Sequence, residues 1–122
     1  MRLEETMAVL TSKPQQTIRE LVAEASSEQF HERRAEKRHP FFCPVAITLN
    51  NEQLQQFSAF SREISNSGIG LLHNMPVERE EVVLTIYREG GPTVNLRAQI
   101  IWCRPCGEGW YLSGARFITA AE

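Results

Sequence analysis

The N-terminal part of the chain shows the hydrophobic period of an amphipathic helix. Four apolar residues recur there at helical spacing: Ile18, Leu21, Val22 and Ala25. Residues spaced in this way lie on one face of a helix, and Ser12 and Pro14 suit its N-cap and its first turn. The apolar face must be covered by the rest of the domain or by a second copy of the chain. A shorter helix before it is predicted from Leu3, Met7 and Leu10.

After Pro40 the period changes to that of β-strands. Apolar residues alternate with others most clearly between Val82 and Tyr87, as they do on strands. Turn signals at roughly ten-residue intervals separate six such segments: residues 41–50, 56–65, 69–73, 81–89, 94–103 and 110–118. Strands and helices do not alternate, which disfavours a parallel nucleotide-binding sheet. The pattern predicts an antiparallel barrel or sandwich.

Turn residues predict where these strands end. Asn50 and Asn51 suit a hairpin turn, and Ser67 and Gly68 interrupt the chain between two strands. Two further turns are expected at residues 90–92 and at residues 104–109, where Gly and Pro cluster.

Composition narrows the class of protein. The chain has 122 residues, 42% of them hydrophobic, which corresponds to a single globular domain. No apolar run approaches the ~20 residues of a membrane span, and Glu4 and Glu5 stand where an export signal would be apolar. All fifteen acidic residues are Glu, so every Asp-dependent motif is absent. Three cysteines, an odd number, favour a reducing compartment. We therefore expect a cytoplasmic protein without membrane insertion.

Charge is unevenly distributed along the chain. Residues 1–32 carry three basic and six acidic side chains, whereas residues 33–38 carry four basic and one acidic. Such a cluster is ordinarily a solvated linker. This one lies where the helical pattern gives way to strands, which suggests a binding role for it.

The run Trp102 to Gly107, WCRPCG, offers two chemical interpretations. It resembles a thioredoxin active site, in which two thiols at the start of a helix exchange with disulfides. Only sixteen residues follow Cys106 here, and they have a strand pattern. A zinc site would need two further ligands, and no second cysteine pair exists. Two structural cysteines on a hairpin are therefore the favoured interpretation.

Two short motifs carry a more specific signal. Arg34 and Arg38 form an R-x-x-x-R motif, and 25 residues after Arg38 comes Glu63-x-Ser65-x-x-Gly68. Together they resemble the PilZ domain family, bacterial receptor modules for the second messenger cyclic di-GMP. The family pattern is R-x-x-x-R before the first barrel strand and (D/N)-x-S-x-x-G on a later strand. Glu63 departs from this pattern, because its side chain is one methylene longer than that of the family's Asp or Asn.

The resemblance implies the fold, the domain division and the ligand. We expect a mainly β protein: a six-stranded antiparallel PilZ-type barrel at residues 33–122, preceded by a helical extension at residues 1–32. The implied ligand is cyclic di-GMP, without a cofactor, a metal or catalysis. The implied ligand-binding residues are Arg33, Arg34, Arg38, Glu63, Ser65 and Gly68.

The residue types suit such a ligand. The planar fork of arginine matches phosphate oxygens and the O6 and N7 acceptors of guanine. A carboxylate such as Glu63 can accept from the guanine N1–H and amino group, and Ser65 can bond base or phosphate. Gly68 permits either an unusual backbone conformation or a close approach. Alternatively, Arg34 and Arg38 pair with nearby glutamates, and Ser67-Gly68 is only a bulge.

These features predict a non-enzymatic receptor whose arginine segment orders on the ligand and alters what the N-terminal helix presents to an unknown protein partner. Arg33 suggests that a stacked pair of nucleotides binds, because a guanidinium can stack on a guanine face. The alternative is a degenerate PilZ adaptor that acts by protein contacts without nucleotide. We expect no nucleic acid polymer as partner, and a homodimer through the N-terminal helix is a further hypothesis.

Overall fold

The computed structural model describes residues 10–26 and 37–119 of the chain. In chain order the elements are the helix α2 (Pro14–Ser26) and the strands β1 (His39–Pro40), β2 (Pro44–Leu49), β3 (Gln56–Ile64), β4 (Gly68–His73), β5 (Glu81–Ile86), β6 (Val94–Gly107) and β7 (Trp110–Phe117). Of the shorter helix predicted from Leu3, Met7 and Leu10, all but Leu10 lies outside the described residues, and Leu10 is not helical. No helix in the described part is long and apolar enough to cross a membrane.

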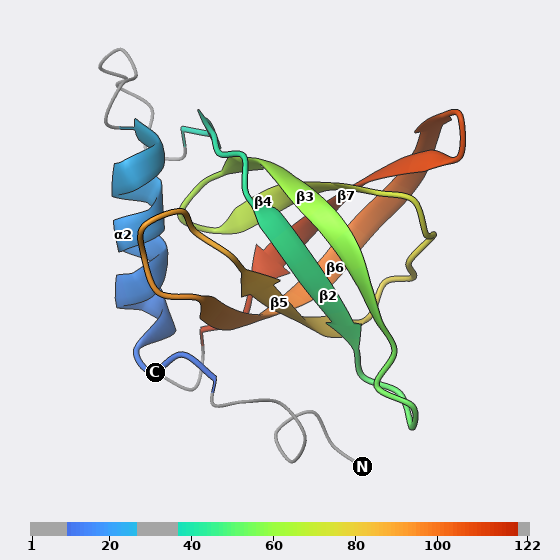
Figure 1. Cartoon of the computed structure of the whole chain (residues 1–122), viewed down its shortest axis with the longest axis horizontal. Coiled ribbons are helices and arrows are strands. Elements are labelled where there is room, and N and C mark those ends of the chain that lie inside the picture. The colour runs from blue at the N-terminus through green and yellow to red at the C-terminus, as the bar shows by residue number, and fades with distance from the viewer. Residues whose placement is uncertain (1–9, 27–36, 120–122) are drawn as a thin grey trace.

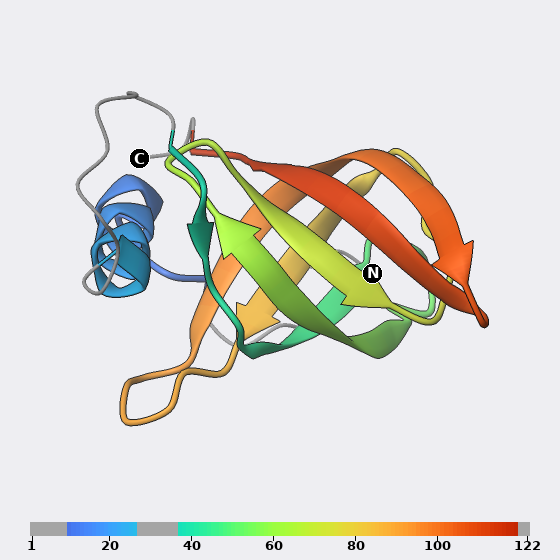
Figure 2. The ribbon, with the colours of Figure 1, turned by 90° about the horizontal axis from the view of Figure 1, so that it is seen from above.

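Strands β2 to β7 close into a six-stranded antiparallel barrel. Their order is β3-β2-β5-β6-β7-β4, and β4 pairs again with β3 to complete the ring. The two-residue strand β1 adds to β3 outside this ring. Figures 1 and 2 show the barrel with α2 beside one end and the β6–β7 hairpin projecting from the other. The predicted barrel is confirmed, and closure leaves β2 and β3 paired on both sides.

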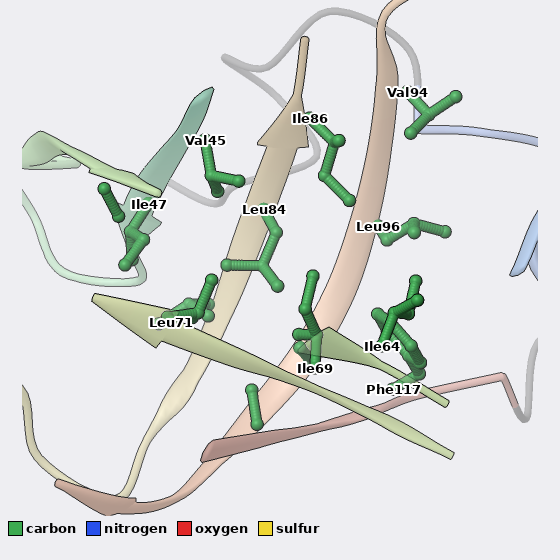
Figure 3. Packing of buried hydrophobic residues seen from close by; sticks show 14 of the residues in the cluster. Val45, Ile47, Ile64, Ile69, Leu71, Leu84, Ile86, Val94, Leu96 and Phe117 are labelled. Atoms are coloured by element: carbon green, nitrogen blue, oxygen red, sulfur yellow. The ribbon is translucent and has the colours of Figure 1, made fainter. Parts of the chain in front are cut away.

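Inward-facing side chains fill the barrel. Figure 3 shows ten labelled members of this core, which come from β2 to β7 and point toward one another. The largest of them, including Ile47, Leu71 and Leu84, are fully buried. Burial of such side chains contributes about 1.5–3 kcal/mol each, so the β-branched and leucine positions of the alternating pattern stabilise the barrel.

Helix α2 packs on the barrel through the predicted apolar stripe. Ile18 and Leu21 are buried in the same core as the strands, and Arg88 forms an ion pair with Glu24 that ties the helix to the loop after β5. The barrel of the same chain covers this stripe, so the structure gives no support to a homodimer through it. The N-cap is Lys13, not Ser12, because the Lys13 carbonyl accepts the first helical hydrogen bond, from Thr17 N at 3.1 Å.

Two predicted turns differ from the structure. The hairpin predicted at Asn50-Asn51 is a loop over residues 50–55, in which Asn51 accepts hydrogen bonds from the amides of Leu54 and Gln55. Asparagine can hold a longer loop in this way because its side chain mimics a backbone acceptor. The turn predicted at residues 104–109 contracts to Glu108 and Gly109, whose φ values of 59° and 82° suit a type I′ turn.

Because the turn is shorter than predicted, both cysteines of the WCRPCG run lie on a strand. Cys103 and Cys106 lie within β6, in an antiparallel hairpin. The thioredoxin interpretation needs the first cysteine at a helix start, so it is wrong. Within the described residues no group of three His, Cys or Glu side chains could hold a metal ion.

His73, the last residue of β4, is fully buried, and its strand neighbours are β3 and β7. Its Nδ1 lies 2.6 Å from the Met75 carbonyl oxygen, and its Nε2 lies 2.7 Å from Ser113 Oγ. A carbonyl only accepts, so Nδ1 carries the proton and the Ser113 hydroxyl donates to Nε2. The ring stacks on Tyr111 and meets Phe57 edge-on. Burial lowers the pKa of His73 below its ordinary value of 6.5.

We expect the free energy of unfolding to fall as the pH drops below about 6.5. The unfolded chain then binds a proton at His73 that the folded state resists, and the loss approaches about 1.4 kcal/mol per pH unit. Urea denaturation between pH 8 and pH 5 should show this for the parent and a flatter profile for His73→Gln. Parallel profiles for the two proteins would contradict the assignment.

Candidate functional site

A groove on the outside of the barrel is lined by most of the predicted ligand-binding residues. It has a volume of about 430 Å³. It is lined by the end of β3, the start of β4, the middle of β6, the second half of β7 and the residue before β1. Arg38, Glu63, Ser65 and Gly68 all line it. Arg33 and Arg34 lie outside the described residues. Four of the six predicted residues are therefore brought together.

Arg38 and Glu63 form an ion pair across the mouth of the groove. Arg38 Nη1 lies 2.9 Å from Glu63 Oε2, with side chains 73% and 29% exposed. β1 brings the two residues together, because Pro40 pairs with Glu63 and His39 with Ile64. An ion pair this exposed contributes at most about 1 kcal/mol. It can therefore open at little cost when a better partner for either group arrives.

A bulge in β3 sets the direction of Glu63. The register shifts between Ser61 and Glu63, so Arg62 is an additional residue and Glu63 stands opposite Gly70 of β4. A Cβ at Gly70 would lie 3.0 Å from Glu63 Cγ. The carboxylate side chain therefore lies flat across Gly70, in space that a larger residue would occupy.

Ser65 builds the tight connection between β3 and β4. Its hydroxyl oxygen accepts from the backbone amides of Ser67 and Gly68 at 3.3 and 3.2 Å, and its own amide donates to the Gly68 carbonyl at 2.9 Å. The side chain is buried. Ser65 thus shapes the groove from below in addition to any contact with a ligand.

Gly68 is required for close packing. Its φ is not positive, whereas a Cβ here would lie 2.6 Å from the Ala115 carbonyl oxygen of β7. Of the two predicted reasons for a glycine, close approach is the correct one. Gly68 opens β4 directly after the turn, and the register shift in β3 lies instead at Arg62.

Trp102 forms a wall of the groove that the sequence analysis missed. Its indole lies over Gly114, where a Cβ would come within 2.5 Å of Nε1. The Arg104 guanidinium lies 4.6 Å from the ring centroid, a cation–π contact. Pairing places Glu63, Gly70, Gly114 and Trp102 in one row across four strands. In the WCRPCG run it is therefore the tryptophan that lines the groove, and the arginine packs on that tryptophan.

The groove has a positive charge although the chain as a whole has a net charge of −2. Arg38, Arg62 and Arg116 line it against the single carboxylate of Glu63. Arg116 reaches the site because β7 pairs it with Gly68. Guanidinium groups around a flat aromatic wall suit a planar, anionic ligand with hydrogen-bond acceptors.

Comparisons with known proteins bear on the family and the fold. Residues 32–122 match the family model described as the PilZ domain. The fold is similar to the inhibitor of motility MotI/DgrA of Bacillus subtilis, with a TM-score of 0.55 and 17% identity over 72% of this chain and 43% of that one. It is also similar to the PilZ domain of YcgR from Escherichia coli with c-di-GMP, with a TM-score of 0.54 and 13% identity over 73% and 80%. The chain spans less than half the length of MotI, and no curated protein matches the sequence.

Proposed function

The chain belongs to the PilZ domain family, and from that premise we propose that it is a cytoplasmic receptor for cyclic di-GMP that regulates a protein partner. One observation carries the proposal. The groove holds Arg38, Glu63, Ser65 and Gly68 together, beside the indole of Trp102. The domain binds and signals, and it performs no chemistry on the ligand.

We propose that each group around the groove takes a different part of the ligand. Arg38 leaves Glu63 and binds a phosphate or the O6 and N7 edge of a guanine, while the Glu63 carboxylate accepts from guanine N1–H and its amino group. A guanine can stack on the face of Trp102 that the Arg104 guanidinium covers, once Arg104 turns aside. Arg33 and Arg34 would supply further guanidinium groups, and Arg33 would let a stacked pair of nucleotides bind.

The coupling to a partner follows from the position of β1. Arg38 leads directly into His39–Pro40, and β1 contacts helix α2 as well as β3. A ligand that draws Arg38 away from Glu63 therefore pulls on the segment that joins the barrel to the helix. We propose that this changes what α2 presents to the partner.

A second function, a PilZ adaptor that acts without nucleotide, is favoured by one observation. Glu63 already accepts a hydrogen bond from Arg38, and its longer side chain reaches that arginine where the family has Asp or Asn. Isothermal titration of the whole chain with cyclic di-GMP separates the two functions. Saturable binding supports the receptor, and absence of heat at ligand concentrations of about 1 mM supports the adaptor.

Trp102 provides a direct test of where the ligand lies. The chain has two tryptophans, and Trp110 lies at the hairpin tip outside the groove lining. We expect Trp102→Ala to weaken cyclic di-GMP binding about tenfold, since one stacked base contributes roughly 1–3 kcal/mol. Trp110→Ala is the matched control and should bind like the parent. Ligand-induced quenching of fluorescence should persist in Trp110→Phe and vanish in Trp102→Phe. Equal affinities of the two alanine variants would place the ligand elsewhere.

A further inference from the structure

A second feature of the barrel surface is an aromatic face on β2, β3 and the end of β5. Phe42, Phe60 and Tyr87 are 77%, 51% and 47% exposed. Pro44 pairs with Phe60, and the Tyr87 amide donates to the Pro44 carbonyl at 3.0 Å. Pro44 of β2, Phe60 of β3 and Tyr87, the residue after β5, therefore stand side by side. We call Phe42, Pro44, Phe60 and Tyr87 the aromatic face. In Figure 1, β2 and β3 cross the near side of the barrel.

Phe42 projects at the border of this face. The segment before β2 runs along β3, because the Phe41 amide donates to the Arg62 carbonyl at 3.0 Å and the Ser61 amide donates to the Cys43 carbonyl at 2.9 Å. Phe41 points into the core and is only 7% exposed, whereas Phe42 is turned outward. Its phenyl ring is therefore held on a hydrogen-bonded backbone.

A hollow of about 300 Å³ opens in the same face. Phe60 and Tyr87 contribute to its lining, together with the small paired residues Ala46 and Ser58. All of its lining residues are uncharged, in contrast to the arginine-lined groove. A hollow of this size can accept an aromatic ring, since a cavity of roughly 150 Å³ holds benzene.

We propose that the aromatic face binds the same face of a second copy of this chain. Each copy has both a projecting ring, Phe42, and an uncharged hollow beside it. A twofold axis then lets the ring of each copy enter the hollow of the other, as an isologous interface requires. The lining of the hollow is uncharged. When the ring of a second copy enters, no charged group of the lining loses its water without gaining a partner.

The strand pairing excludes one way in which two copies could associate, and the exposed area sets how strongly they associate. β2 and β3 are paired on both sides, so an extended partner cannot add to them as a strand. At about 200 Å² for each aromatic side chain, the three exposed rings offer roughly 350 Å² per copy. The two faces together stay below the ~1,200 Å² of stable complexes. The dimer is therefore weak, reversible and dependent on concentration.

Sedimentation equilibrium of the whole chain from about 10 μM to about 1 mM, the range of weak complexes, tests the proposal. The average mass should rise from 13.9 kDa toward twice that value. Phe42→Glu should weaken self-association at least tenfold, because it would bring a charge into an uncharged hollow. Met75→Glu is the control, since Met75 is also half exposed but lies outside the aromatic face.

A second variant distinguishes specific docking from general stickiness. Ser58→Trp fills the hollow and adds apolar surface. The proposal expects weaker association, whereas non-specific association would become stronger. A parent that remains monomeric at about 1 mM, the weak limit, would overturn the proposal. So would an unchanged Phe42→Glu variant or a more strongly associating Ser58→Trp variant. These measurements contain no nucleotide, so their failure leaves the proposed receptor function untouched.

Discussion

Replacement of Arg38 by alanine is expected to lower the affinity for cyclic di-GMP at least tenfold and to leave the fold intact. Arg38 is 73% exposed, and its side chain pairs with the groove residue Glu63. Loss of an exposed ion pair costs at most about 1 kcal/mol, whereas a charge-assisted contact to a ligand contributes about 1.5–3 kcal/mol. The substitution therefore affects binding more than stability. Isothermal titration at fixed ionic strength, with thermal unfolding in parallel, measures both.

Arg79→Ala is the matched control for this experiment. Arg79 is an exposed arginine in the loop between β4 and β5, and it does not line the groove. The Arg79→Ala substitution removes the same charge from the protein as Arg38→Ala, so any long-range electrostatic effect appears in both variants. An affinity loss of equal size in the two would show that Arg38 acts only through net charge.

Gly68→Ala is expected to destabilise the domain by about 1–3 kcal/mol, the usual cost of overpacking. The added Cβ would lie 2.6 Å from the Ala115 carbonyl oxygen, a backbone atom that cannot rotate away. Ile69 pairs with Ala115, and the Phe117 amide donates to the Ser67 carbonyl at 2.9 Å, so β4 and β7 must separate to make room. Urea denaturation followed by circular dichroism gives the change in the free energy of unfolding.

Gly70→Ala distinguishes an effect on the stability of the fold from an effect on ligand binding. A Cβ at Gly70 would meet only the Glu63 side chain, at 3.0 Å from its Cγ, and that chain can turn aside. We expect its free energy of unfolding to change by less than about 1 kcal/mol, while ligand affinity falls because the carboxylate is displaced. If Gly68→Ala were as stable as Gly70→Ala, the close contact between β4 and β7 would not matter for the fold.

The function proposed for Glu63 depends on the residues around it as much as on the length of its side chain. The bulge at Arg62 and the bare surface of Gly70 give the longer side chain room to lie flat. In that position it holds Arg38 at the groove mouth. The receptor and the adaptor thus differ in whether a guanine can compete with Arg38 for the same carboxylate.

The sequence by itself determined the elements and most of the fold. Helical spacing of apolar residues marked α2, and alternation with regular turn signals marked six strands of an antiparallel barrel or sandwich. The pairing of β3 with β4 decided for the closed barrel. Both signals arise from contacts between near neighbours, and they can be read from the order of residues alone. The two motifs also identified four residues that line the groove. They could be found from the sequence because the residues of each motif lie close together along the chain.

Only the tertiary structure decided how distant strands register and therefore what completes the site. Trp102 and Arg116 reach the groove through the pairing of β6 with β7 and of β7 with β4. The bulge at Arg62, the shortened turn at residues 108–109 and the ion pair between Arg38 and Glu63 also follow from pairing between strands. A shift of one residue turns a strand's side chains to the opposite face. The sequence therefore places a residue on a strand, and cross-strand packing decides which face and which neighbours it meets.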